Sequence, residues 1–198
     1  MHQGYTQRSD KADGHAAPDA GTVERALDHL RQARSFAEAV SLDRRLFTEP
    51  AEFDAWRSGI ADLYYMLLQV CTASLALEHG SEVTPQELMA YLDGVQGGKL
   101  VNRFVAPEFG VDGTASAGVS VEELRYAHPI SKAVVTGTLL RQIKQAAEGL
   151  AGHADRRIRD EATTLQLTVQ SLALIFADMG AGLLIAAGLG DKLGLGLA

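Results

Sequence analysis

The chain has 198 residues, of which 46% are hydrophobic and 22% charged, a balance typical of one soluble globular domain. Its net charge of −7 argues against a nucleic-acid partner, because phosphate binding needs a basic surface. Arginine is more frequent than lysine and alanine is abundant, which indicates a bacterial genome of high GC content. No apolar signal segment opens the sequence, so we expect a cytoplasmic protein.

The first half of the sequence predicts a tail followed by three helices. Residues 1–21 are polar and lack apolar periodicity, so we expect a flexible N-terminal tail before a bundle domain over 22–198. A helix over 23–40 follows, with Thr22 as its N-cap. A second helix runs from Thr48 to near Gly80 and carries apolar residues on more than one face. Thr84-Pro85-Gln86-Glu87 is a capping box that opens the third helix.

The second half predicts a long loop and further helices. Residues 99–119 contain proline and several glycines, and a loop of this length in a compact domain is usually functional. Another capping box starts at Ser120, Ser131 can cap the next helix, and Asp155 caps the last one. No strand-like alternation persists, so the fold class we expect is all-α, a single-domain bundle of five to six helices.

The last helix shows the most regular pattern of the chain. Apolar or small residues recur at alternating steps of four and three, which places them on one helical stripe. From Leu172 onward the other faces are apolar as well, so we expect a long, apolar, central C-terminal helix. The stripe consists of Ile158, Ala162, Leu165, Val169, Leu172, Phe176, Met179, Leu183 and Ala186.

The segment 172–190 also meets the length rule for a bilayer span. Its carboxylate, Asp178, would cost about 2.5–3.5 kcal/mol near the middle of a membrane. The apolar stripe continues without a break from the charged first half of the helix, as a core helix requires and a tail anchor does not. We therefore favour the bundle core, with contact to a membrane as the less favoured alternative.

Asp178 and His128 are the candidate catalytic residues. A carboxylate in apolar surroundings has a raised pKa unless a cation is near, and then serves as a general acid or base. His128 precedes Pro129 at a helix break, where its imidazole is placed to shuttle a proton. The alternative role for Asp178 is structural, as the partner of Arg141, Lys144 or His128. The alternative for His128 is a surface position at the bend, which is the favoured one of the two.

The residues expected to surround a bound small molecule are aromatic, small or hydroxyl-bearing: Trp56, Tyr64, Tyr126, Ser171 and Gly182. The alternative for the aromatic residues is a plain core position, which is the commoner role of aromatic side chains at helical spacing. No Glu-x-x-His pair and no cluster of cysteine and histidine is present, so we expect no metal site, and the sequence indicates no particular cofactor. Cys71 lies in an apolar run, which is typical of a buried structural cysteine.

These patterns leave three functional hypotheses open. The first is a helical bundle that binds a small molecule and uses a buried carboxylate as general acid or base. The second is a non-catalytic protein that forms a homodimer or acts as an adaptor, with the apolar end of the last helix packed against another subunit. The third is a tail-anchored membrane protein.

Overall fold

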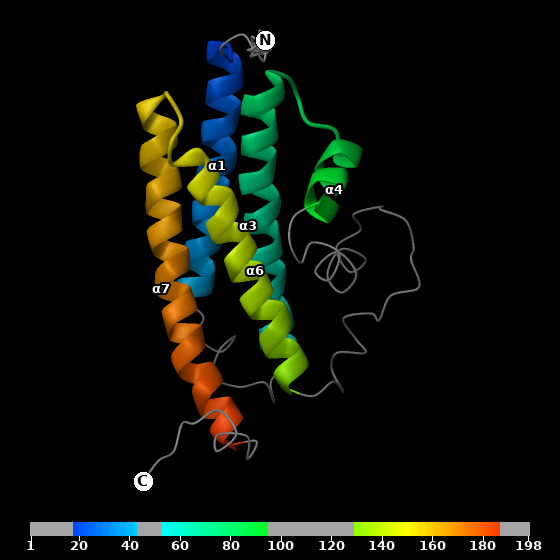
Figure 1. Ribbon diagram of the computed structural model, residues 1–198, viewed down its shortest axis with the longest axis vertical. Coiled ribbons are helices and arrows are strands. Elements are labelled where there is room, and N and C mark those ends of the chain that lie inside the picture. Colours follow the sequence, from blue (N-terminus) through cyan, green and yellow to red (C-terminus); the bar gives the residue numbers. More distant parts are fainter. Residues whose placement is uncertain (1–17, 43–52, 95–128, 187–198) are drawn as a thin grey trace, which may run out of the picture.

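The computed structural model describes residues 18–42, 53–94 and 129–186, and the side chains within 18–40, 56–94 and 135–177. In this part of the chain the secondary structure is entirely helical: α1 (Ala20–Leu42), α3 (Phe53–His79), α4 (Pro85–Gly94), α6 (Pro129–Leu150) and α7 (Arg156–Ala186) (Figure 1). The expected all-α bundle is confirmed. The predicted loop over 99–119 and the short helix after Ser120 lie outside the described residues.

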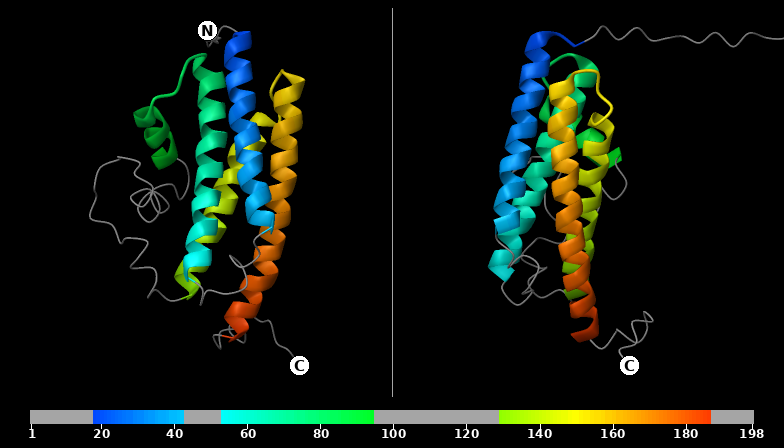
Figure 2. Two further views of the ribbon diagram at one scale, coloured as in Figure 1. Left: turned by 180° about the vertical axis from the view of Figure 1, so that it is seen from behind. Right: turned by 90° about the vertical axis from the view of Figure 1, so that its left-hand side faces the viewer.

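Four helices form the bundle, and each packs against two neighbours in the order α1, α3, α6, α7 and back to α1. The pairs α1/α3 and α6/α7 are antiparallel hairpins, while α3 and α6 run in the same direction (Figures 1 and 2). Parallel neighbours need a long connection, and the chain between α3 and α6 contains α4. α4 lies against α3, outside the four-helix ring (Figure 1).

One close contact in each hairpin shows how the paired helices are aligned. His29 and Gln69 join α1 to α3 through a 2.6 Å hydrogen bond between Nδ1 and Oε1. Between α6 and α7, a Cβ placed on Gly137 would lie 3.3 Å from Cε1 of Phe176. This small residue therefore lets the two helices approach closely at that level.

The helix ends follow the capping chemistry of the sequence in most places. Thr84 and Glu87 form the predicted capping box, with the Glu87 carboxylate accepting the Thr84 backbone N–H at 2.8 Å. Gly80 ends α3 with a φ of 67°, a conformation that favours glycine. The Thr22 cap is wrong: α1 begins at Ala20, and Asp19 accepts the Thr22 backbone N–H at 2.6 Å.

Two further predictions of helix starts have different outcomes. α6 already begins at Pro129, because the missing proline N–H costs nothing in the first turn, so Ser131 lies inside the helix and does not cap it. Asp155 does cap α7, accepting the Arg157 backbone N–H at 2.8 Å.

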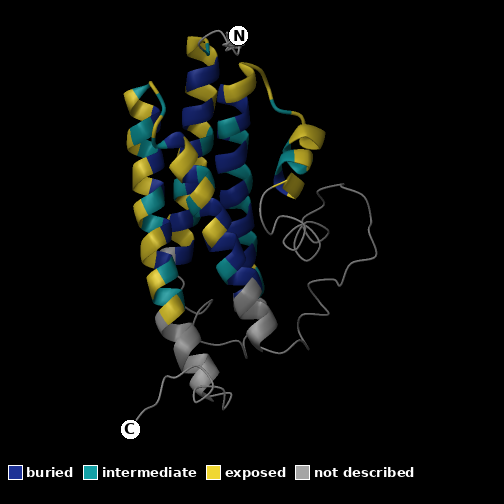
Figure 3. Cartoon of the chain, in the orientation of Figure 1, coloured by how far each residue is buried: buried dark blue, intermediate teal, exposed yellow. Residues whose placement is uncertain are grey.

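The C-terminal helix was expected to be long, apolar and central. It is long, but it is neither the most apolar nor the central helix. α7 is 31 residues long, but its main contacts are with α1 and α6 only, and its remaining side is exposed (Figure 3). α3 is the most enclosed helix, because α1, α6 and α4 all pack against it. The predicted stripe of α7 does face the core, since Ile158, Leu165 and Val169 are buried.

Among the described residues, the most apolar stretch also belongs to α3. Trp56–His79 is long and apolar enough to cross a bilayer, with a mean hydropathy of 1.5, yet 61% of its most apolar window is buried inside the bundle. The core helix of a bundle has the same length and composition, so this stretch is weak evidence for a membrane. The alternative span over 172–190 lies largely beyond the described side chains.

Candidate functional site

The most unusual surface among the described residues is the outward side of α7. Seven exposed residues line it: Thr163, Thr164, Leu167, Gln170, Ser171, Leu174 and Ala177. We call this set the outer face of α7. Leu167 is 59% exposed and Leu174 is 66% exposed, and they are the large hydrophobic side chains most open to solvent in the described structure. Because they are seven residues apart, both leucines project from the same side of the helix.

No charge interrupts the outer face of α7. The sequence has no acidic or basic residue from Ala162 to Ala177, so all charged side chains described on this helix lie between Arg156 and Glu161. α1 differs, because its exposed side carries both acids and bases, among them Glu24, Asp28 and Arg31. Charged residues are what normally keep an exposed helix face in water.

Three hydroxyl groups along this side of α7 bond to their own helix. Thr164 donates to the carbonyl oxygen of Asp160 at 2.9 Å, and Ser171 donates to that of Leu167 at 3.0 Å. The half-buried Thr168 does the same with Thr164 at 3.0 Å. With their protons directed to the backbone, these side chains present less hydrogen-bonding capacity to solvent than their composition implies.

The opposite side of α7 explains why the helix holds this orientation. Ile158, Ala162, Leu165, Val169 and Leu172 are all buried against the bundle. A helix with one stripe fixed in a core cannot rotate to hide a second apolar surface. The exposure of Leu167 and Leu174 therefore follows from the packing of the other stripe.

Two of the predicted ligand-binding residues are part of the core. Trp56 is 2% exposed, and its indole Nε1 donates a hydrogen bond to the Thr136 hydroxyl oxygen at 3.2 Å. Tyr64 is fully buried on the same helix. This burial is the main reason why the pKa of its phenol lies above the ordinary value. Both residues have a packing role that requires no ligand.

The other predicted site residues are not joined to these two within the described structure. Ser171 lies on the exposed outer face of α7, whereas Trp56 and Tyr64 belong to α3. The main contacts of α7 are with α1 and α6. His128 and Tyr126 lie outside the described residues. Asp178 and Gly182 belong to the last turns of α7, but their side chains are not among those described. The site around Asp178 therefore stays a prediction.

Cys71 is buried, as its apolar neighbours in the sequence indicate. Desolvation raises the pKa of its thiol to about 12, so the reactive thiolate is scarce at neutral pH. Among the described residues, no group of three or more histidine, cysteine, aspartate or glutamate side chains is placed to hold a metal ion.

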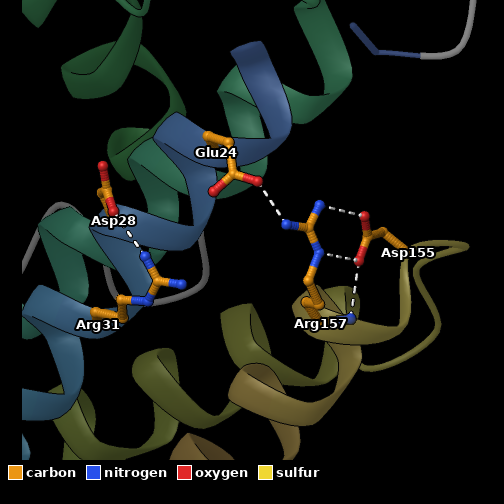
Figure 4. A network of polar contacts seen from close by, with 5 residues as sticks. All are labelled: Glu24, Asp28, Arg31, Asp155 and Arg157. Atoms are coloured by element: carbon orange, nitrogen blue, oxygen red, sulfur yellow. Dashed lines mark hydrogen bonds and ion pairs between the residues drawn. The ribbon is translucent and has the colours of Figure 1, made fainter. Parts of the chain in front are cut away.

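A polar network connects the first turns of α1 and α7 (Figure 4). The Arg157 guanidinium bonds to the Glu24 carboxylate and, at 3.0 Å, to the Asp155 carboxylate. These carboxylates, Asp155 first, raise the pKa of Arg157 above its ordinary value. All three side chains have well over a fifth of their surface in solvent, so the network fixes the ends of the two helices and forms no enclosed site.

No family model, no curated protein and no solved structure matches this chain.

Neither Leu167 nor Leu174 was among the site residues predicted from the sequence. A signal for them was present, because the two leucines are one heptad apart within a stretch of sixteen residues, 162–177, that carries no charge. The four-three stripe on the opposite side of the helix is the more regular pattern, and its residues from Ile158 to Leu172 are buried in the core.

Proposed function

We propose that this protein is a non-catalytic helical interaction protein that forms a homodimer through the outer face of α7. The observation that carries the proposal is the exposure of Leu167 and Leu174 on an uncharged helix face. A contiguous exposed apolar patch marks a site of interaction with a protein, a membrane or a ligand.

A second copy of the same chain is the partner that fits this surface. Each molecule has a net charge of −7, so two copies repel each other on average. The outer face of α7 carries no charge between Thr163 and Ala177 and can meet itself without repulsion. A two-fold symmetric dimer uses the same patch on both subunits, so the patch must be able to contact a copy of itself.

The expected dimer is of moderate affinity. Complete burial of a leucine side chain contributes about 1.5–3 kcal/mol, so the four leucines of a dimer contribute about 6–12 kcal/mol. Association costs about 4 kcal/mol or more in lost freedom of movement. The difference is at most about 8 kcal/mol, which corresponds to a dissociation constant on the order of micromolar at best, and smaller differences give a dimer in the millimolar range.

The small-molecule hypothesis has less support from the described residues. Trp56 and Tyr64 are packed in the core, and Ser171 is exposed on a different helix with its hydroxyl proton bound to the backbone. A ligand site built on Asp178 remains a separate hypothesis, tested by Asp178→Asn once a ligand is known.

Light scattering over a range of concentrations tests the dimer directly. We expect the full chain to change from monomer to dimer between micromolar and low millimolar concentrations, and Leu167→Glu and Leu174→Glu to stay monomeric with unchanged helical circular dichroism. Ala39→Glu adds the same charge to the exposed side of α1 and should dimerise like the wild type. A wild-type chain that stays monomeric throughout this range, or a dimer that both leucine variants retain, would refute the proposal.

A second measurement separates a protein partner from lipid. The wild-type chain is mixed with vesicles of phosphatidylcholine and phosphatidylglycerol and floated on a density gradient. We expect it to remain at the bottom. Flotation that Leu167→Glu abolishes would assign the outer face of α7 to a membrane and would overturn the dimer.

A further inference from the structure

We infer that the two copies pair with their α7 helices antiparallel, about a two-fold axis beside Gln170 and Ser171. Leu167 of each copy then packs against Leu174 of the partner subunit. This inference rests on the proposed dimer and adds its geometry.

The distribution of charge along α7 favours the antiparallel arrangement. Asp160, Leu167 and Leu174 follow one another at seven-residue steps, so a parallel pair that aligns the leucines also brings the two Asp160 side chains together. An antiparallel pair places each Asp160 opposite position 181 of the partner helix, one turn from the partner's Asp178. No two acids of α7 then lie at the same level, whereas the parallel pair aligns both Asp160 and Asp178 with their own copies. The antiparallel pair also sets the two helix dipoles in opposition, which lowers their electrostatic energy.

The length of α7 favours an axis at this position. Residue 171 is the midpoint of Arg156–Ala186, and the boundary between residues 170 and 171 is also halfway between Leu167 and Leu174. A pairing centred there overlaps the helices along almost their full length. Thirty-one residues extend about 46 Å, and a contact strip about 10 Å wide gives roughly 450 Å² for each copy.

That area is below the roughly 800 Å² per partner of a standard interface, so a register shifted along the helix would lose contact that the dimer needs. The last turns of α7 also extend past the ends of the neighbouring helices (Figures 1 and 2). In the centred antiparallel pair, each of these projecting ends lies beside the first half of the partner's α7.

The residues at the proposed axis suit each other. Gln170 of one copy faces Ser171 of the partner subunit, and the Gln170 amide can donate to the serine oxygen. That oxygen keeps its lone pairs for accepting, because the serine proton already goes to the Leu167 carbonyl oxygen at 3.0 Å. Ala177 and Thr164, which are small, face each other one turn beyond the leucines.

Disulfide crosslinking distinguishes the two directions. The single native cysteine, Cys71, is buried and does not compete for oxidation. We introduce Leu167→Cys, Leu174→Cys and Ser171→Cys separately, with Ala39→Cys on α1 as the control. Each variant is oxidised at a concentration at which the wild-type chain is dimeric, and the products are separated on a non-reducing gel.

The antiparallel pair predicts three results. A mixture of the Leu167→Cys and Leu174→Cys chains gives the crosslinked heterodimer, either variant alone gives little, and Ser171→Cys alone crosslinks. In this geometry the two copies of position 167 are seven residues apart along the axis, about 10 Å, which exceeds the Cα separation that a disulfide spans. The Ala39→Cys control should not crosslink.

The contrary outcomes separate the inference from the proposed function. Efficient crosslinking of Leu167→Cys alone and of Leu174→Cys alone would show a parallel dimer, overturning the orientation while the dimer stands. A dimer in scattering with no crosslink in any variant would move the interface away from the outer face of α7 and overturn both. A monomer in scattering with no crosslink would overturn the proposed function itself.

Discussion

Trp56 donates its indole N–H to the hydroxyl oxygen of Thr136 at 3.2 Å, which joins α3 to α6 inside the core. Both residues are almost completely buried, at 2% and 1% exposure. A buried donor that loses its acceptor still pays the cost of leaving water, so breaking this bond should destabilise the fold. The bond also holds together two parallel helices that are connected only through a long intervening segment.

Thr136→Val should destabilise the protein by about 1–2 kcal/mol, because valine has the shape of threonine but cannot accept the indole proton. Urea unfolding followed by the fluorescence of Trp56, the only tryptophan, gives the value. Thr136→Ser keeps the hydroxyl and should lose less than the valine variant. Equal stability of the valine variant and the wild type would show that the hydrogen bond contributes nothing.

Glycine at two positions of α6 tests how closely α6 and α7 pack. Gly149→Ala should stabilise the protein by about 0.5–1 kcal/mol, because nothing lies within 4 Å of the added Cβ and alanine restricts the unfolded chain. Gly137→Ala should gain less or lose stability, since its Cβ would lie 3.3 Å from the Phe176 ring. Thermal unfolding of both variants measures the difference. An equal gain at both positions would mean that the ring moves aside without cost.

Asp155 should make the stability of the protein depend on pH at the acid end. Its hydrogen bonds with the Arg157 side chain and backbone lower the pKa of its carboxyl below the ordinary 3.8. The charged form is therefore the stabilising one: its contribution is complete above the pKa of the unfolded chain and is lost as the pH falls through the lower folded value.

Asp155→Asn should accordingly lower the urea midpoint at pH 7, and the gap to the wild type should close below pH 3.8. Asp160→Asn is the matched control, because Asp160 is 68% exposed and pairs only at 3.4 Å with Arg156. We expect little change in this control at either pH. A gap that widens on acidification would contradict the assignment of the charged Asp155 as the stabilising form.

Cys71 should resist thiol reagents as long as the bundle stays folded. Burial raises the pKa of its thiol to about 12 and also blocks access to the sulfur. We expect the absorbance of a chromogenic disulfide reagent to rise only in denaturant, whereas the Ala39→Cys variant should release one equivalent at once in buffer. Rapid labelling of the native chain would mean that α3 opens without global unfolding.

The pattern of apolar residues was sufficient to predict most helices. The four-three stripe of α7 packs inward at Ile158, Leu165 and Val169 because burial of apolar surface orients a helix whatever its neighbours are. The capping box at Thr84 and the cap at Asp155 were also predictable, since each bond forms within a few residues of the chain. These features are local, and local chemistry is contained in the sequence.

The candidate site could be predicted less well. The sequence is compatible with both a pocket and a core position for Trp56 and Tyr64, because nothing in it shows that Thr136 and the core surround them. Ser171 directly precedes the buried Leu172 in the sequence, yet it lies on the outer face of α7, away from the core. The side chains of Asp178 and Gly182 lie outside the described residues, so the prediction about them stands as it was made.

The sequence by itself determined that the chain is all-α, where α4 and α7 begin, and which stripe of α7 is apolar. Only the tertiary structure decided which helix is enclosed. α1, α6 and α4 all cover α3, while α7 has neighbours on one side only and keeps Leu167 and Leu174 in solvent. The physical reason is that periodicity specifies which face of a helix avoids water, whereas the number of neighbours around a helix depends on contacts between distant segments of the chain.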